Sequence, residues 1–178
     1  MKTKSRDMVQ VAVLAAITAV SAWITVPAYV PFTMQTFAVF LAAGVLGTKK
    51  GTLAVLIYIL LGVLGLPVFS GGRAGLGVVF GETGGYIIGF LPAVYICGRL
   101  NSVQKCRFSL FLSMLSGLLI IYVFGILWFW VVYARGDEAK SLLMIVTGGV
   151  LPFIVPDLIK IALATVVTGQ MKRRTNLF

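Results

Sequence analysis

Histidine is absent from this sequence, acidic residues number five, and there are two cysteines. Charged residues make up 11% of the 178 positions, whereas hydrophobic residues make up 60%. A soluble domain has about 25% charged residues, so water is a poor candidate for the main solvent of this chain. The composition therefore favours a membrane domain.

The same shortages exclude several kinds of chemistry. Cys97 and Cys106 are expected within or just after one helix, on the cytoplasmic side, where a disulfide is not expected. Because the chain has no histidine, a metal site is not expected either. The stretch GTKKGT at residues 47–52 has the wrong spacing for a phosphate-binding G-x-x-x-x-G-K-[ST] loop. We expect no bound cofactor and no ATP hydrolysis by this chain, and we find no convincing internal repeat.

Long apolar runs are abundant instead. A hydrocarbon core of about 30 Å needs roughly 20 helical residues. The run at residues 141–171 allows a short extra helix before a full span, with a break near Pro152 and Pro156. The first run is too long for a cleavable signal peptide. We predict an all-α polytopic membrane protein, with residues 1–178 forming one membrane domain. The six predicted transmembrane helices cover residues 8–26, 32–48, 51–67, 83–100, 108–134 and 150–171.

The basic residues predict the orientation of these helices. One set of helix ends carries eleven cationic residues, and the other carries three, balanced by Glu82, Asp137 and Glu138. The positive-inside rule therefore places both termini in the cytoplasm, for a multi-pass protein of the cell (plasma) membrane. Four small basic clusters argue against binding to nucleic acid. The eleven residues are Lys2, Lys4, Arg6, Lys49, Lys50, Arg99, Lys105, Arg107, Lys172, Arg173 and Arg174.

Two long segments are predicted on the outer side, at residues 27–37 and 66–86. The second contains seven glycines between Gly71 and Gly85, and long ordered loops of this kind are usually functional. One interpretation is a compact cap over the bundle, and the other is a lid that closes a pocket open to the outside. A single polar side chain in these segments, such as that of Arg73, is compatible with either the cap or the lid.

Asp157 and Lys160 stand alone inside an apolar segment. A charge within a membrane span costs about 2.5–3.5 kcal/mol on insertion scales and usually marks a ligand or ion pathway. Positions three apart share one helix face, so the two side chains can pair and face one cavity. A purely structural salt bridge is the alternative. Lys160 is expected roughly 12 Å below the outer end of its helix, which indicates a polar small ligand bound from outside.

Three stretches carry a specific resemblance. They are VPFTMQTFAVFLAAGVLG at residues 30–47, GLPVFSGGRAGLGVVFGETGGYIIGF at residues 65–90, and PDLIK at residues 156–160. Together with the six-span layout, the chain resembles the BioY family, the biotin-specific substrate-binding (S) components of energy-coupling-factor (ECF) transporters. Ala74 and Glu82 depart from the commonest pattern of that family, which affects the expected loop conformation more than the expected ligand.

The resemblance implies biotin as the transported ligand. Asp157 suits the ureido N–H groups, because an ionised carboxylate only accepts hydrogen bonds. Lys160 suits either the ureido carbonyl or the valerate carboxylate, and Arg73 is the other candidate for the carboxylate. The substrate-binding residues implied by the resemblance are Asp157, Lys160, Arg73, Gly72, Tyr86, Gln35 and Thr33.

The resemblance also implies partners, since the chain lacks an ATPase of its own. These are a transmembrane coupling protein and two ATP-hydrolysing subunits, which drive release after the S component tips in the membrane. The first helix offers small-x-x-x-small pairs that permit close helix contact, and ordinary packing within the bundle is the alternative. The candidate docking residues are Ala12, Ala15, Ala16 and Ala19. The sequence leaves open whether the chain works alone, as a homo-oligomer or within the complex.

Two other classes of function are alternatives to biotin binding. One is an S component for another vitamin, such as thiamine or riboflavin, which a panel of vitamins would separate. The other is a membrane enzyme using Asp157 and Lys160 as acid and base, but it lacks a candidate nucleophile or metal ligand within the spans. An ion channel is disfavoured because one span alone carries intramembrane charge.

Overall fold

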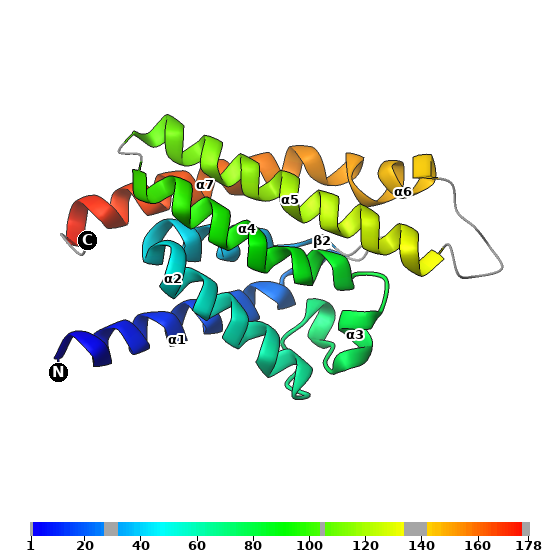
Figure 1. Ribbon diagram of the computed structural model, residues 1–178, viewed down its shortest axis with the longest axis horizontal. Coiled ribbons are helices and arrows are strands. Elements are labelled where there is room, and N and C mark those ends of the chain that lie inside the picture. Colours follow the sequence, from blue (N-terminus) through cyan, green and yellow to red (C-terminus); the bar gives the residue numbers. More distant parts are fainter. Residues whose placement is uncertain (1, 27–31, 104–105, 134–141, 176–178) are drawn as a thin grey trace.

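The computed structural model describes residues 2–26, 32–103, 106–133 and 142–175, almost all of them helical. Long helices lie side by side along the longest axis of the molecule, and both termini are found at the same end (Figure 1). The elements are α1 (Lys2–Trp23), β1 (Thr25–Val26), β2 (Phe32–Thr33), α2 (Gln35–Val63), the 3₁₀ helix η1 (Ser70–Gly72), α3 (Leu76–Phe80), α4 (Gly84–Val103), α5 (Arg107–Tyr133), α6 (Leu142–Gly149) and α7 (Leu151–Thr175).

Helix α2 consists of two arms that meet at Gly47. This residue has φ 71° and ψ −166°, a conformation that is essentially restricted to glycine. A Cβ added at Gly51 would lie 2.9 Å from the carbonyl oxygen of Ala42, although a continuous helix would separate these positions by about 13.5 Å. The chain therefore folds back at Gly47, and the two arms correspond to the segments predicted at 32–48 and 51–67.

The predicted helix start at residue 32 is wrong, because the first turn of that segment is extended. Phe32 and Thr33 form β2, which pairs antiparallel with β1 through Thr25↔Thr33 and Val26↔Phe32. This pairing of the two short strands brings the start of α2 close to the end of α1.

The second arm of α2 also ends earlier than predicted, at Val63.

The short helix predicted before the last long helix is α6, and the chain breaks between Gly149 and Leu151. Pro152 lies in the first turn of α7, where a missing N–H is tolerated. The prediction that Pro156 also marks the break is wrong, because Pro156 lies inside α7. The predicted helices at 83–100 and 108–134 match α4 and α5 closely, although residue 134 lies outside the described part of the chain.

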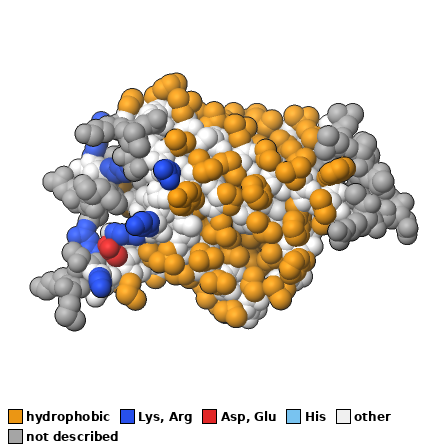
Figure 2. Space-filling view, in the orientation of Figure 1, with side chains coloured by type: hydrophobic (Ala, Val, Ile, Leu, Met, Phe, Trp, Pro, Cys, Tyr) orange, Lys and Arg blue, Asp and Glu red, His pale blue; other side chains and the backbone are white. Residues whose placement is uncertain are grey.

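The exterior of the bundle is largely apolar. Figure 2 shows one face covered with hydrophobic side chains, with Lys and Arg gathered at the end that carries the termini. By length and composition, four helical segments of the described chain could cross a membrane: Lys4–Trp23, Gln35–Val63, Arg107–Val132 and Val146–Arg173. The outer charges predicted at residues 135–140 and the outer-loop residues 27–31 lie outside the described residues.

Candidate ligand-binding site

Asp157 and Lys160 lie one helical turn apart on α7 and form the predicted pair. Lys160 Nζ is 2.8 Å from Asp157 Oδ1, and each residue is only 4% exposed. Both side chains are shielded from water, so the attraction between the two charges acts in a medium of lower dielectric constant than water. The pair is therefore a buried ion pair in the wall of the bundle.

The carboxylate of Asp157 accepts hydrogen bonds from side chains on three helices. Besides the ammonium on α7, Thr36 on α2 donates to Oδ1 at 3.0 Å, and Tyr122 on α5 donates to Oδ2 at 2.7 Å. An ionised carboxylate has about four acceptor positions. Three are occupied by these protein donors, which leaves room on Oδ2 for one further donor.

The ammonium of Lys160 is tied to the strand β2 as well as to Asp157. It donates to the Thr33 carbonyl oxygen at 2.5 Å and to Thr36 Oγ1 at 3.2 Å, and Nζ lies 3.7 Å from the centroid of the Phe32 ring. A lysine has three N–H donors, and the structure supplies three acceptors. A cation over an aromatic face is further stabilised by the ring quadrupole.

A second polar cluster joins the two arms of α2. The Thr33 hydroxyl donates to Gln35 Oε1 at 2.9 Å, and Gln35 Nε2 donates to the hydroxyl of the fully buried Tyr58. The Tyr58 ring makes an edge contact with Phe69, whose centroid is 5.8 Å away. This cluster links β2 and both arms of α2 to the glycine-rich segment.

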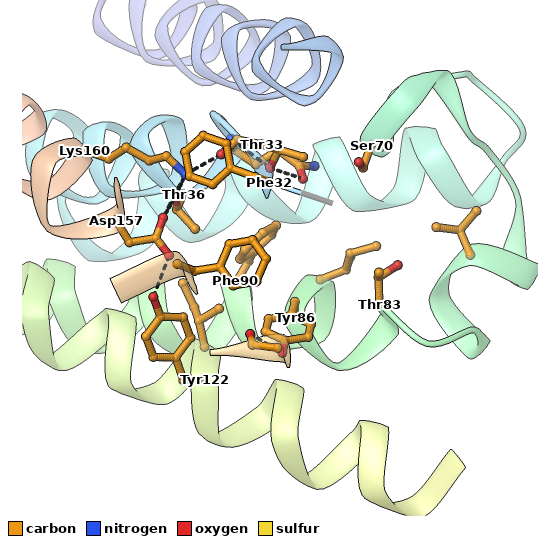
Figure 3. A pocket seen from close by; sticks show the side chains of 16 residues that line it. Phe32, Thr33, Thr36, Ser70, Thr83, Tyr86, Phe90, Tyr122, Asp157 and Lys160 are labelled. Atoms are coloured by element: carbon orange, nitrogen blue, oxygen red, sulfur yellow. Dashed lines mark hydrogen bonds and ion pairs between the residues drawn. The ribbon is translucent and has the colours of Figure 1, made fainter. Parts of the chain in front are cut away.

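These groups line one pocket between the helices. It has about 620 Å³ of space, counted with its open mouth. Figure 3 shows the ion pair at one end and aromatic rings along the walls. The lining residues are Phe32, Thr33, Gln35, Thr36, Ser70, Val78, Thr83, Tyr86, Ile87, Phe90, Ile121, Tyr122, Gly149, Phe153, Asp157 and Lys160.

Tyr86 forms part of the pocket wall and is fixed at both ends. Its hydroxyl donates to the carbonyl oxygen of Gly149 at 2.9 Å. Its ring lies against Gly125 of α5, where an added Cβ would come within 2.4 Å of the ring. Gly125 therefore makes the space that this aromatic wall occupies.

A model of the BioY family matches residues 1–176. The chain belongs to the BioY family. The probable biotin transporter BioY of Pyrococcus horikoshii is 42% identical over 173 residues, covering 97% of this chain and 99% of that protein. The biotin transporter BioY of Thermotoga maritima is 40% identical over 170 residues, covering 94% and 96%. Membership of this family and the apolar helices together make the chain a multi-pass membrane protein.

A solved structure has the same fold. The crystal structure of the S component for biotin from an ECF-type ABC transporter superposes with a TM-score of 0.86 at 24% sequence identity. The match covers 97% of this chain and 94% of that one. The arrangement of helices described above is therefore the S-component fold.

Most of the substrate-binding residues predicted from the sequence of this BioY member meet at the pocket, and two do not. Thr33, Gln35, Tyr86, Asp157 and Lys160 all line it. Gly72 and Arg73 are not among the lining residues. The Arg73 side chain is exposed, and its Nε donates back to the Ser70 carbonyl oxygen at 3.1 Å.

The four alanines of α1 divide between two faces. Ala15 is 2% exposed, and Ala19 packs against the core. Ala12 and Ala16 are exposed, beside the exposed Val13. The two small-x-x-x-small pairs therefore differ, because one packs inside the bundle and the other lies on its surface.

Several lining residues could not be singled out from the sequence. Thr36 and Tyr122 bind Asp157 from other helices, and neither shares a local pattern with it. Tyr122 gave one usable signal, since it is a hydroxyl-bearing side chain in the middle of a very apolar segment. Phe32, Phe90 and Phe153 gave none, because phenylalanine is common throughout apolar helices.

Proposed function

We propose that this chain is the substrate-binding S component of an ECF-type uptake transporter and that its ligand is biotin. The observation that carries the proposal is the buried Asp157–Lys160 pair in the wall of a pocket that aromatic rings help to line. Charges in such a position are usually retained for a ligand or an ion. The names of the relatives, which are biotin transporters, support the same ligand.

The ureido ring of biotin fits the charged end of the pocket. Its N–H groups need acceptors, and Asp157 Oδ2 has an acceptor position next to the one that Tyr122 uses. Its carbonyl needs a donor, and Lys160 can release Thr36 Oγ1, the longest of its hydrogen bonds at 3.2 Å. The pair thus offers an acceptor and a donor side by side, the complement of a urea.

The remainder of the pocket suits the apolar part of biotin. Phe32, Tyr86, Phe90 and Phe153 supply aromatic surface along its walls. Burying the thioether ring and the alkyl chain against these rings gains about 25 cal/mol for each Å² removed from water. Polar contacts at the charged end then determine the orientation of the ligand.

We further propose six membrane crossings within one domain spanning residues 1–178. The crossings are α1, the two arms of α2, α4, α5 and the α6–α7 segment. The apolar exterior and the reversal at Gly47 support this count. The gathering of Lys and Arg at the end that carries both termini supports a cytoplasmic location for that end (Figure 2). The pocket then opens to the outside, with the strand pair and the glycine-rich segment forming its lid.

Uptake requires partners, which we propose to be a transmembrane coupling protein and two ATPase subunits. The exposed face of α1 supports this docking role, because Ala12 and Ala16 would let a partner helix approach closely. Val13 and Val20 add exposed apolar surface to the same helix. The chain itself acts as a binding protein in this scheme and not as an enzyme.

Calorimetric titration of the purified chain in detergent tests the ligand. We expect saturable binding of biotin, no binding of thiamine or riboflavin, and a large loss of biotin affinity in Asp157→Asn. Ser116→Ala is the matched control, because Ser116 donates to the Ser113 carbonyl oxygen and does not line the pocket. A folded wild-type chain that does not bind biotin, or that prefers another vitamin, would contradict the proposal.

A further inference from the structure

The end of the pocket away from the ion pair carries two hydroxyl groups. Ser70 and Thr83 lie there, across the aromatic walls from Asp157 and Lys160 (Figure 3). In the described part of the chain, Ser70 Oγ is one of three buried side-chain atoms without a hydrogen-bond partner. It is also the one of these three that lines the pocket. Buried polar atoms are nearly always bonded, so an exception at a pocket wall indicates a ligand atom.

The backbone around Ser70 is held firmly by its own hydrogen bonds. Phe69 N donates to the Arg73 carbonyl oxygen at 3.0 Å, and Gly72 N donates to the Phe69 carbonyl oxygen at 3.0 Å. The Phe69 ring lies against Gly62, where a Cβ would come within 2.2 Å of it. Ser70 therefore presents its hydroxyl from a preorganised turn, which lowers the entropic cost of binding.

Thr83 is fixed by its position at the start of α4. Its carbonyl oxygen accepts hydrogen bonds from Tyr86 N at 3.2 Å and from Ile87 N at 3.4 Å. Two hydroxyls from separate segments of the chain, one before α4 and one in η1, thus contribute to the same end of the pocket. Hydroxyls are donors as well as acceptors, so they can receive an anionic oxygen.

Two charged side chains lie near this end but outside the pocket. Arg73 bonds to the Ser70 carbonyl oxygen at 3.1 Å, and Glu82 precedes Thr83. Both side chains are exposed and neither lines the pocket. Water and salt therefore screen both charges, and the two hydroxyls are the polar groups that face a ligand at this end.

Neither cation considered for the ligand carboxylate is well placed to bind it directly. The one donor that Lys160 can release is assigned to the ureido carbonyl, and its charge is balanced by Asp157. Arg73 does not line the pocket. An anion placed at the charged end would also face the Asp157 carboxylate, and like charges at short distance repel.

We propose that the hydroxyls of Ser70 and Thr83 bind the carboxylate of the ligand. This inference rests on the proposed function, because it assumes a biotin whose ureido ring lies at the charged end. It assigns the two ends of the pocket to the two ends of the ligand.

The test compares biotin with its neutral carboxamide on the wild type, Ser70→Ala, Thr83→Val and Asp157→Asn. Hydrogen bonds to charged groups are about twice as strong as those to neutral ones. Ser70→Ala and Thr83→Val should each weaken biotin about tenfold and the carboxamide by no more than about threefold. Asp157→Asn should weaken both ligands by the same factor, because both carry the ureido ring.

The outcomes separate the two proposals. A larger loss for biotin than for the carboxamide in Ser70→Ala or Thr83→Val supports the assignment. Equal losses for the two ligands, or no loss in either variant, would overturn it while leaving biotin binding intact. Failure of the wild type to bind either ligand would instead contradict the proposed function. Ser116→Ala again serves as the control, and thermal unfolding of each variant checks the fold.

Discussion

The hydroxyl of Tyr122 on α5 donates a 2.7 Å hydrogen bond to Asp157 Oδ2 on α7, both residues being buried. This contact fixes the direction of the carboxylate plane and leaves one acceptor position on Oδ2 facing the pocket. Tyr122 therefore orients the Asp157 carboxylate, which we expect to bind the ureido ring, and it does not need to contact the ligand itself.

Tyr122→Phe should weaken biotin binding about tenfold, because the loss of its hydrogen bond leaves the carboxylate free to rotate. The ring volume is nearly unchanged, so the free energy of unfolding should fall only by the contribution of that hydrogen bond, about 1.5–3 kcal/mol. Titration calorimetry and a thermal unfolding assay measure the two effects. Unchanged affinity would show that Thr36 and Lys160 are sufficient to orient Asp157.

Lys160→Met should destabilise the chain by about 3–5 kcal/mol, because it leaves the buried carboxylate of Asp157 without its ammonium partner. The double variant Asp157→Asn with Lys160→Met removes both charges and should recover much of that loss. Unfolding in detergent compares the two. Biotin binding should be absent from both variants.

A double variant that is as unstable as Lys160→Met would contradict this account. The cost would then come from the lost contacts of Lys160 with Thr33 and Phe32 and not from an uncompensated charge.

Gly47→Ala should destabilise the chain by about 1–3 kcal/mol through backbone strain alone, since φ is 71° there and no atom lies within 4 Å of an added Cβ. Gly77→Ala is the matched control. An added Cβ at Gly77 likewise meets nothing within 4 Å, and its φ is not in the positive region. Thermal unfolding should therefore separate the two variants, and equal stability would contradict the reversal at Gly47.

Ala16→Trp should abolish uptake while leaving biotin binding by the purified chain unchanged, because a large side chain on the exposed face of α1 keeps a partner helix at a distance. The assay is uptake of labelled biotin in cells that also express the coupling protein and the ATPases. Leu119→Trp, at an exposed apolar position on α5, is the control. Equal uptake by the two variants would remove α1 from the docking surface.

Local patterns in the sequence were sufficient for the ion pair and for most helices. Asp157 and Lys160 are three residues apart on one helix, so their pairing follows from helix geometry, and the structure confirms it. Helices α4 and α5 closely match the ranges predicted from the apolar runs at residues 83–100 and 108–134. In each case residues close in sequence determine the outcome.

Contacts between residues far apart in the sequence account for the features of the site that the sequence did not predict. Thr36 lies 121 positions from Asp157 along the chain, so nothing in either segment predicts their contact. Phe32 and Thr33 have a helical neighbourhood in sequence, but pairing with β1 holds them extended. Arg73 does not line the pocket, and its Nε bonds to the Ser70 carbonyl oxygen of its own turn. Each of these outcomes depends on a partner that the local sequence does not contain.

The bond from Lys160 to the Thr33 carbonyl oxygen makes one side chain serve two purposes. The same ammonium helps to form the charged end of the pocket and holds the strand that closes over it. A mutation that replaces Lys160 to accept a different vitamin would also release that strand. A change of specificity made at Lys160 would therefore need a second change that supplies a new partner for the Thr33 carbonyl oxygen.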